Sequence, residues 1–365
     1  MYTRFADNDI VTRQAQELVT STWTNNVNNL QEHWTSSTQA DFTSPTSSGQ
    51  FFIDVYNGDA TVSTSEVQYS VAYGNRYGSG SPDFTRDTGS FGLNAARTTY
   101  NQFRQLHYND DTKYFTFGTH TPDDIYVINI NRARYKQKLT KGSLNFHLSA
   151  SSRNTNPGGV EPDQSTWNTV HLTDDSVTNS KGVGTSNLGT YYNIVSGSDG
   201  VVLSGTTATT QLGASASYGN FYPEAGLIIL NGDAFSASMG NTGGSTDVMS
   251  ERNPAHTDNT DNNARRIKNA ISGGAYFIVD STEEINSQFY FCRVRNDQYN
   301  YTNNESFVDT NKNIRFESMK LNPKVFITTI GLYNDAYELL AIAKLSQPVA
   351  KDFTKEALIR VKLDY

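Results

Sequence analysis

Apolar and polar positions form their clearest pattern near the end of the chain. Residues 325–332 (VFITTIGL) and 337–345 (YELLAIAKL) are rich in apolar residues and flank turn residues at 333–336, a pattern typical of a β-hairpin. Pro348 is expected to end the second strand. In residues 357–365 apolar and charged side chains alternate, which predicts a strand with one buried face. We therefore expect the chain to end inside a sheet that closes a core or an interface.

Short apolar runs bounded by turn residues predict further strands along the rest of the chain. The run at 226–230 (GLIIL) has no polar side chain, so we expect burial on both of its faces. The other predicted strands are residues 51–56, 67–73, 113–117, 125–130, 144–148, 169–172, 191–195, 201–203, 276–279, 287–294 and 313–318.

Helical spacing is found in fewer places. Residues 93–107 carry one apolar stripe, which predicts an amphipathic helix. The stripe consists of Leu93, Ala96, Tyr100 and Phe103. Residues 264–272 predict a shorter helix that ends at two glycines, and a third short helix is expected over residues 10–18, where the periodicity is weak.

Together these elements predict a mainly β fold, a β-rich α+β protein with antiparallel sheets in a sandwich-like core, a few short helices and long loops. Residues 1–49 are expected to form an extended N-terminal arm that becomes ordered on a neighbouring molecule or, alternatively, docks on its own domain. Residues 50–149 and 221–365 form the predicted β-rich core with the C-terminal hairpin. Residues 150–220 are predicted to be a loop-rich β insertion.

Composition adds that the chain is polar without being highly charged. Of 365 residues, 36% are hydrophobic, 18% charged and 12% aromatic, and the aromatic content argues against disorder. The 29 basic and 37 acidic residues give a net charge of −8, which disfavours general nucleic-acid binding. No run approaches the roughly 18 apolar residues of a membrane span, and no secretory leader is recognised. We expect a soluble protein that packs on neighbours through tyrosine, without a membrane partner.

One dense basic segment stands out in this acidic chain. It consists of Arg132, Arg134, Lys136, Lys138 and Lys141. The segment is our candidate partner-binding site, a docking strip for an acidic protein or, less in keeping with the net charge, for a phosphate backbone. The alternative is a solvated strand or helix edge, where lysine and arginine are common and discourage aggregation between sheets.

The sequence contains no signature of catalysis or of a cofactor site. The glycine-rich loop at 74–81 lacks the P-loop arrangement, and no G-x-S-x-G, H-E-x-x-H, dinucleotide or EF-hand motif occurs. Adjacent carboxylates such as Asp174 and Asp175 should point apart in a strand, so they do not make an acid/base pair. We therefore predict no enzyme activity, no cofactor and no small-molecule substrate.

Metal and disulfide chemistry are not predicted either. The single cysteine, Cys292, lies in a predicted strand and is expected to be a buried structural thiol. His256, Asp258 and Asp261 occur close together in the sequence, but they fall in a predicted solvated loop, and no metal site is expected there.

Six stretches carry a resemblance to a known group of proteins. They are residues 48–56 (SGQFFIDVY), 66–75 (EVQYSVAYGN), 128–136 (ININRARYK), 221–223 (FYP), 328–335 (TTIGLYND) and 341–344 (AIAK). In these stretches the chain resembles the virion structural proteins of cyanophage-type contractile-tailed bacteriophages (myoviruses). The resemblance implies a virion component present in multiple copies, a tail baseplate wedge protein that is assembled in the host cytoplasm. Its implied partners are other virion proteins and copies of itself.

Two alternatives stay open from the sequence. The loop-rich region 150–263 can present aromatic side chains to carbohydrate, as in a host-surface-binding or depolymerising tail module. These side chains are Trp167, Tyr191, Tyr192 and Tyr218. The second alternative is a head or neck protein that contacts DNA through Arg132 and Arg134.

Overall fold

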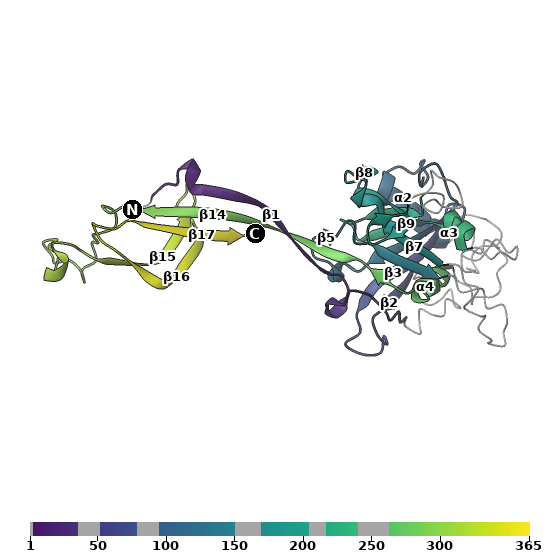
Figure 1. Cartoon of the computed structure of the whole chain (residues 1–365), viewed down its shortest axis with the longest axis horizontal. Coiled ribbons are helices and arrows are strands. Elements are labelled where there is room, and N and C mark those ends of the chain that lie inside the picture. The colour runs from purple at the N-terminus through teal and green to yellow at the C-terminus, as the bar shows by residue number, and fades with distance from the viewer. Residues whose placement is uncertain (1–2, 36–51, 79–94, 150–168, 204–216, 240–262) are drawn as a thin grey trace. The chain divides into compact units, whose positions relative to one another are not determined.

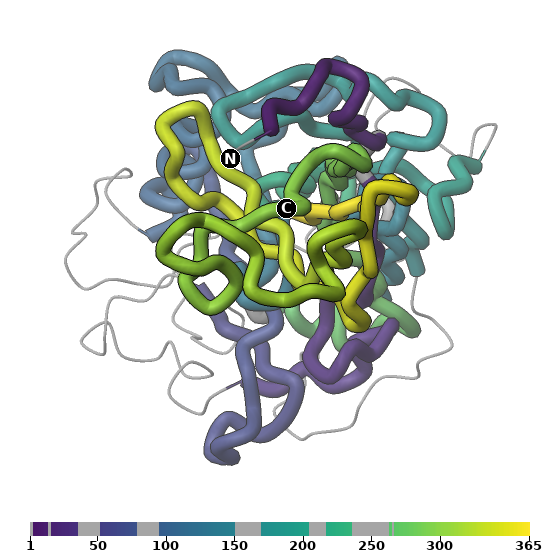
Figure 2. The backbone as a smooth tube through the Cα atoms, turned by 90° about the vertical axis from the view of Figure 1, so that its left-hand side faces the viewer, coloured from purple at the N-terminus to yellow at the C-terminus, as the bar shows by residue number. Residues whose placement is uncertain are grey.

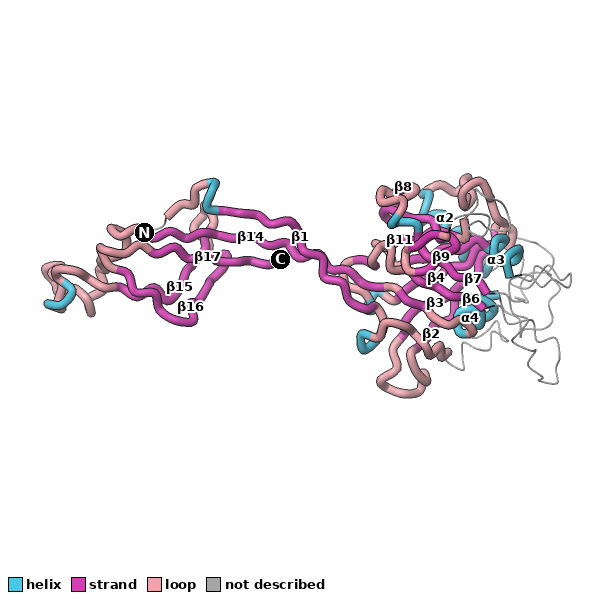
Figure 3. The backbone as a smooth tube through the Cα atoms, viewed as in Figure 1, coloured by secondary structure: helices cyan, strands magenta, loops and turns pink. Residues whose placement is uncertain are grey.

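A computed structural model describes most of the chain, and the described part is the coloured trace in Figure 2. The described residues are 3–35, 52–78, 95–149, 169–203, 217–239 and 263–365. They divide into two compact units that we describe separately. Unit 1 contains Met1–Glu17 and Glu284–Tyr365, and unit 2 contains Leu18–Glu283. The predicted fold class is confirmed, because the structure is mainly β with large antiparallel sheets and few helices (Figure 3).

Unit 2 is built on one antiparallel sheet that curls into half of a barrel and that, in the described residues, contains eleven strands (Figure 1). Nine of them pair in the order β13-β6-β7-β9-β11-β12-β4-β3-β2, and β8 and β10 both pair with β9. Their bounds are Phe52–Tyr56 (β2), Val67–Asn75 (β3), Asp124–Ile130 (β4), Asn145–Ser149 (β6), Thr169–Asp174 (β7), Gly184–Ser186 (β8), Gly189–Ser198 (β9), Val201–Val202 (β10), Gly219–Tyr222 (β11), Leu227–Asn231 (β12) and Phe277–Ile278 (β13).

Both faces of this sheet are buried, as strand β12 shows. Ile228 and Leu230 belong to the larger of two apolar clusters, whereas Leu227 and Ile229 belong to the smaller one. Because successive side chains of a strand point to opposite faces, a strand covered on both sides needs a continuous apolar sequence. The prediction of two buried faces for residues 226–230 is confirmed, because each of these residues is buried.

Three helices are described in unit 2, Ala95–Tyr108 (α2), Gly232–Met239 (α3) and Asn263–Ser272 (α4). The two predicted helices correspond to α2, which buries Ala96 and Tyr100, and to α4, which buries Ile267 and Ile271. The apolar stripe of each helix packs on the clusters of the sheet. None of the helices in the described ranges has the length and apolar character that crossing a membrane requires.

The smaller cluster is dominated by aromatic rings around a buried histidine. The Tyr222 hydroxyl and His107 Nδ1 are 2.9 Å apart, and burial lowers the pKa of His107 to about 4. Residues 113–117 supply Phe115 and Phe117 to this cluster. The strand predicted there is wrong, because Phe117 pairs only with His120, in an isolated bridge.

The predicted insertion at 150–220 is not separate from the sheet. Strand β7 lies between β6 and β9, and β9 in turn pairs with β11, so these strands continue the same sheet. Residues 150–168 and 204–216 lie outside the described residues.

Residues 10–35 differ from the predicted helix and arm. Residues 10–18 are not helical, since Ile10–Ser21 form strand β1, which lies beside β14 in the order β1-β14-β17. Farther along, Trp23 and Leu30 are buried in the larger cluster of unit 2. Of the two interpretations of the arm, these residues support docking on the chain's own domain, and residues 36–49 lie outside the described part.

Unit 1 consists of strands with loops and short 3-10 turns. Strand β17 (Ala357–Asp364) pairs antiparallel with β14 (Asp280–Val294). The predicted hairpin is confirmed as β15 (Val325–Tyr333) and β16 (Leu339–Lys351). The alternation predicted for β17 is also confirmed up to Asp364, whereas the final Tyr365 is exposed.

Pro348 does not end the second strand of the hairpin, so this prediction is wrong. Strand β16 continues to Lys351, and the register shifts between Ile327 and Thr329 of the partner strand. Pro348 lies in the irregular stretch opposite this shift, where no ladder hydrogen bond from its nitrogen is needed. Proline is tolerated at such bulges, which explains why the strand passes through it.

Candidate assembly surface

Units 1 and 2 differ in how far they bury their apolar side chains. Every member of the two apolar clusters found in the described residues lies in unit 2. In the described part of unit 1, the buried apolar side chains are Val308, Leu332, Ala357 and Val361. A segment of about 100 residues normally buries a core of its own. Many of the other apolar side chains in the described part of unit 1 are exposed.

The outer face of the β15–β16 ribbon carries four of these side chains. We use this name for Tyr333, Leu339, Leu340 and Ile342, which are 42%, 47%, 68% and 57% exposed. On the opposite side of the ribbon, Leu332 is buried and pairs with Ala341. The ribbon therefore carries apolar side chains on both sides, and Leu332 on the inner side is buried.

A bulge explains why so many apolar residues share the outer face. Leu332 pairs with Ala341, but the next residue, Tyr333, pairs with Leu339, so Leu340 is the extra residue. Gly331 lies beneath this group, and a Cβ added there would be only 2.8 Å from the Tyr333 ring and 3.3 Å from Leu339 Cδ1. Glycine thus lets the two large side chains lie flat across the ribbon.

Two opposite charges lie at the two ends of the apolar run 339–343. Glu338 precedes the strand at the turn, where Asn334 Nδ2 donates a hydrogen bond of 2.7 Å to Glu338 Oε2. Lys344 lies at the other end, is exposed, and pairs across the ribbon with Thr329. The order along the strand is acidic, apolar, basic.

The charge of unit 1 as a whole is balanced. It contains 13 lysines and arginines and 13 aspartates and glutamates, so the net charge of −8 of the full chain resides in unit 2. On the β14–β17 sheet the guanidinium carbons of Arg13 and Arg360 lie 5.7 and 5.2 Å from the Phe289 ring centroid. These cation–π contacts occupy the aromatic ring within unit 1.

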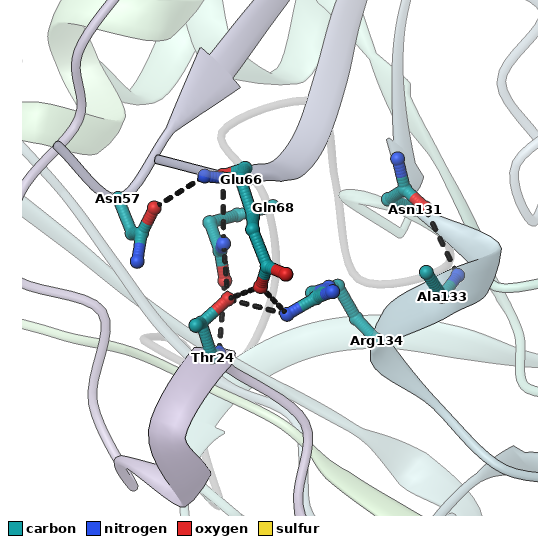
Figure 4. A network of polar contacts seen from close by, with 7 residues as sticks. All are labelled: Thr24, Asn57, Glu66, Gln68, Asn131, Ala133 and Arg134. Carbon is teal, nitrogen blue, oxygen red and sulfur yellow. Dashed lines mark hydrogen bonds and ion pairs between the residues drawn. The ribbon is translucent and has the colours of Figure 1, made fainter. Parts of the chain in front are cut away.

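The predicted basic docking strip is interrupted in the structure. Arg134 donates to Glu66 over 2.6 Å and to the Thr24 hydroxyl, and Gln68 Nε2 also donates to that hydroxyl (Figure 4). The Thr24 hydrogen bond and the Arg134 charge lower the pKa of Glu66. Arg134 therefore ties the segment after β1 to the sheet of unit 2.

The other four strip residues have different surroundings. The Arg132 guanidinium lies 4.7 Å from the Tyr135 ring and donates to the Tyr135 carbonyl. Lys138 is half-buried in β5 (Lys138–Leu139), which pairs with β14, whereas Lys136 and Lys141 are exposed. The strip does not present five equivalent cations, and this weakens its interpretation as one docking or DNA-binding surface.

Replacing Arg134 with alanine should destabilise unit 2 by about 1 to 3 kcal/mol, because Glu66 and Thr24 lose their shared donor. All three tryptophans lie in unit 2, so urea unfolding followed by tryptophan fluorescence reports on it. Lys136→Ala, in the same strip but exposed, is the control and should change stability by less than about 0.5 kcal/mol. Equal losses in the two variants would contradict the internal role of Arg134.

The aromatic side chains considered for carbohydrate binding are not presented together. Tyr192 and Tyr218 are 5% and 4% exposed, and Tyr191 packs against the smaller cluster. Trp167 lies outside the described residues. Of the four candidates, Tyr192 and Tyr218 are thus buried in unit 2, and Tyr191 is partly buried.

The adjacent carboxylates and the single cysteine were also considered from the sequence, and the structure describes their surroundings. Asp174 accepts backbone hydrogen bonds from Gly142 and Leu144, whereas Asp175 accepts from Asn193, so each of the adjacent carboxylates has its own hydrogen-bond donors. Burial raises the pKa of the half-buried Cys292 thiol in β14, which disfavours its reactive thiolate. In the described ranges no three potential metal ligands gather, and residues 256–261 lie outside them.

Comparisons of this chain with protein-family models, with curated proteins and with solved structures gave no match. The functional argument therefore depends on the residues and their geometry.

Sequence reasoning identified the hairpin but not its outer face. A signal was present, because YELLAIAKL has five consecutive apolar residues and lacks the alternation of a strand with one wet face. Such a run indicates two apolar faces, and a lone two-stranded ribbon can cover only one of them with its own unit.

Proposed function

We propose that this chain is a structural subunit of a bacteriophage virion, a tail baseplate wedge protein, and that it assembles through protein contacts made by unit 1. The observation that carries the assembly role is the contrast between the two units. Unit 2 buries two apolar clusters, whereas unit 1 leaves the outer face of the β15–β16 ribbon exposed. Exposed apolar faces of this kind mark sites of protein association.

The proposal of a phage particle rests on the sequence resemblance. One of its stretches, residues 328–335, forms most of β15 and the start of the turn to β16, beside Glu338. The stretch that carries the resemblance and the exposed apolar face are therefore parts of the same hairpin. A subunit that contributes such hairpins to its neighbours suits a particle built from many protein copies.

The experiment is quantitative mass spectrometry of purified particles. Phage particles are banded on a density gradient and washed in high salt, and peptides of this chain are compared with those of the major tail protein. We expect the chain to stay with the particles at a constant ratio through successive washes. Its removal by washing, or its absence from the particles, would overturn the proposed function.

A further inference from the structure

We propose that strand β17 binds an acidic protein segment, which adds to the open edge of β17 as a further strand and places its carboxylates beside the cations of the β1–β14–β17 sheet. This inference rests on the proposed assembly role and names the chemistry of a partner of unit 1. It is carried by the position of the cations, by their lack of carboxylate partners and by the open edge.

The cations gather on one side of the sheet in which β1, β14 and β17 lie side by side (Figure 3). Phe289 of β14 pairs directly with Lys362 of β17, so these two side chains point to the same side. Alternate residues of each strand share that side, and Arg13 of β1 reaches it through its contact with the Phe289 ring. We call this side the basic face, and its exposed cations are Arg13, Arg293, Arg360 and Lys362.

Three of these four cations have no carboxylate partner in the described ranges. Lys362 donates to Asp364 over 2.9 Å, but the described residues supply no ion pair to the three arginines. The Arg13 and Arg360 guanidinium carbons lie 5.7 and 5.2 Å from the Phe289 ring centroid instead. Two like charges beside one ring attract an anion more strongly than either charge does alone.

The opposite side of the same sheet is apolar and covered. Ala357 and Val361 of β17 are buried and pair with Val294 and Tyr290 of β14. Because successive side chains of a strand point to opposite sides, β17 is apolar on its covered side and charged on the basic face. The basic face is therefore the exposed side of this strand.

Strand β17 also has an open edge. It is the last strand in the order β1-β14-β17, and the described part of the chain places no strand on its other side. About half of the backbone N–H and C=O groups of such a strand point away from its one neighbour. An extended segment can pair with these groups. Alternate side chains of that segment would then lie beside Arg360 and Lys362.

Protection of sheet edges does not explain the whole basic face. Lysine and arginine on an edge strand prevent unwanted pairing of sheets, which would account for Arg360 and Lys362. Arg293 differs, because it belongs to β14, which lies between β1 and β17 in the sheet. A cation on the middle strand protects no edge, but it adds to the positive potential of the face.

An acidic protein segment fits this site better than a nucleic acid does. Only a polypeptide supplies the backbone groups that extend a sheet by one strand. The full chain has a net charge of −8, which repels a long phosphate backbone far more than a short segment with a few carboxylates. Carboxylates at alternate positions of the segment match the cations of the basic face in sign and spacing.

The test titrates the purified full chain into a dye-labelled peptide of about ten residues in which glutamate and threonine alternate, and follows fluorescence anisotropy. We expect saturable binding that slows hydrogen exchange in residues 357–364. A block peptide, with all its threonines before its glutamates, has the same composition. Only about half of its glutamates can reach the basic face from a strand, so it should bind about fivefold or more weakly. Equal binding of the two peptides, or binding that leaves residues 357–364 unprotected, would overturn the strand addition.

Charge reversal tests the position of the segment. Arg360→Glu changes the edge strand itself and should weaken binding of the alternating peptide by about tenfold or more. Arg13→Glu should weaken it by only about two- to threefold, because β1 lies about 10 Å from β17, where salt screens the charge. Lys344→Glu is the matched control, since it makes the same charge change at an exposed residue of unit 1 on β16, and it should change binding by less than about twofold. Equal losses in Arg360→Glu and Lys344→Glu would overturn the role of the basic face.

The outcomes separate this inference from the proposed function. A chain that is retained in washed particles but does not bind the alternating peptide would overturn the acidic segment as the partner and leave the proposed function standing. Tighter binding of a thymidine oligonucleotide than of the peptide would overturn the choice of a protein segment. A chain that binds the peptide as expected but is absent from particles would overturn the proposed function alone.

Discussion

Replacing Trp23 with alanine is expected to destabilise unit 2 by about 3 to 5 kcal/mol, the range for removing a large buried aromatic side chain. Trp23 is 2% exposed, its ring centroid lies 4.8 Å from that of Phe277, and its Nε1 donates to the Phe277 carbonyl over 2.8 Å. The substitution opens a cavity in the larger cluster and leaves this buried carbonyl without its indole donor. The loss should appear as a lower urea midpoint, measured by far-ultraviolet circular dichroism.

Trp34→Ala is the control for this prediction. Trp34 is 47% exposed and its Nε1 donates to Glu32, so its removal should cost less than about 1 kcal/mol. Trp23→Phe retains most of the buried area but lacks the N–H group, and it should fall between the two. Similar midpoints for Trp23→Ala and the wild type would contradict the anchoring of residues 22–35 on the sheet of unit 2.

Replacing Lys351 with methionine is expected to destabilise unit 1 by about 2 to 4 kcal/mol. Lys351 is 1% exposed, and its Nζ donates to the carbonyls of Asn296 and Gln298 and to Asn300 Oδ1, the last at 2.6 Å. Methionine has a similar size but no donor. The oxygens that surround Nζ would lose the donor they share.

Hydrogen exchange is the appropriate measurement, since unit 1 contains no tryptophan. Amides of residues 295–300 and of the end of β16 should exchange faster in Lys351→Met than in the wild type. Lys355→Met is the control, because the Lys355 side chain is 61% exposed and lies 4.0 Å from Asp352. If exchange in Lys351→Met is as slow as in this control, Lys351 does not order the loop.

The elements that could be predicted from the sequence are those in which buried and exposed positions follow a regular pattern. The continuous apolar sequence of β12 indicates a strand that is buried on both faces. The apolar stripe of α2 indicates a helix that is buried on one face. Strand β1 was mistaken for a helix because Ile10, Val11, Leu18 and Val19 are all exposed. Without a buried face, the strand shows no alternation of apolar and polar residues.

The candidate surface could be predicted only in part for a related reason. Hydrophobic patterning locates a hairpin at 325–345, but only the bulge at Leu340 fixes which residues share the outer face. Arg134 shows the opposite case. Its position in a basic run suggested an exposed docking residue, whereas the contact with Glu66, 68 residues away, places it inside unit 2.

One chain thus combines a well-packed unit with one that has little core. Unit 2 buries both faces of its sheet by itself, whereas the exposed apolar side chains of unit 1 would be buried by the proposed assembly. Unit 1 should therefore gain stability when the chain enters a particle, because binding to the folded state shifts folding by mass action, and unit 2 should not.

Hydrogen exchange of the free chain and of the chain in purified particles tests this claim most directly. Amides of β15 and β16 should be more protected in the particles than in the free chain, while amides of β4 and β12 serve as an internal reference and stay constant. Equal protection of β15 and β16 in the particles and in the free chain would contradict assembly through unit 1.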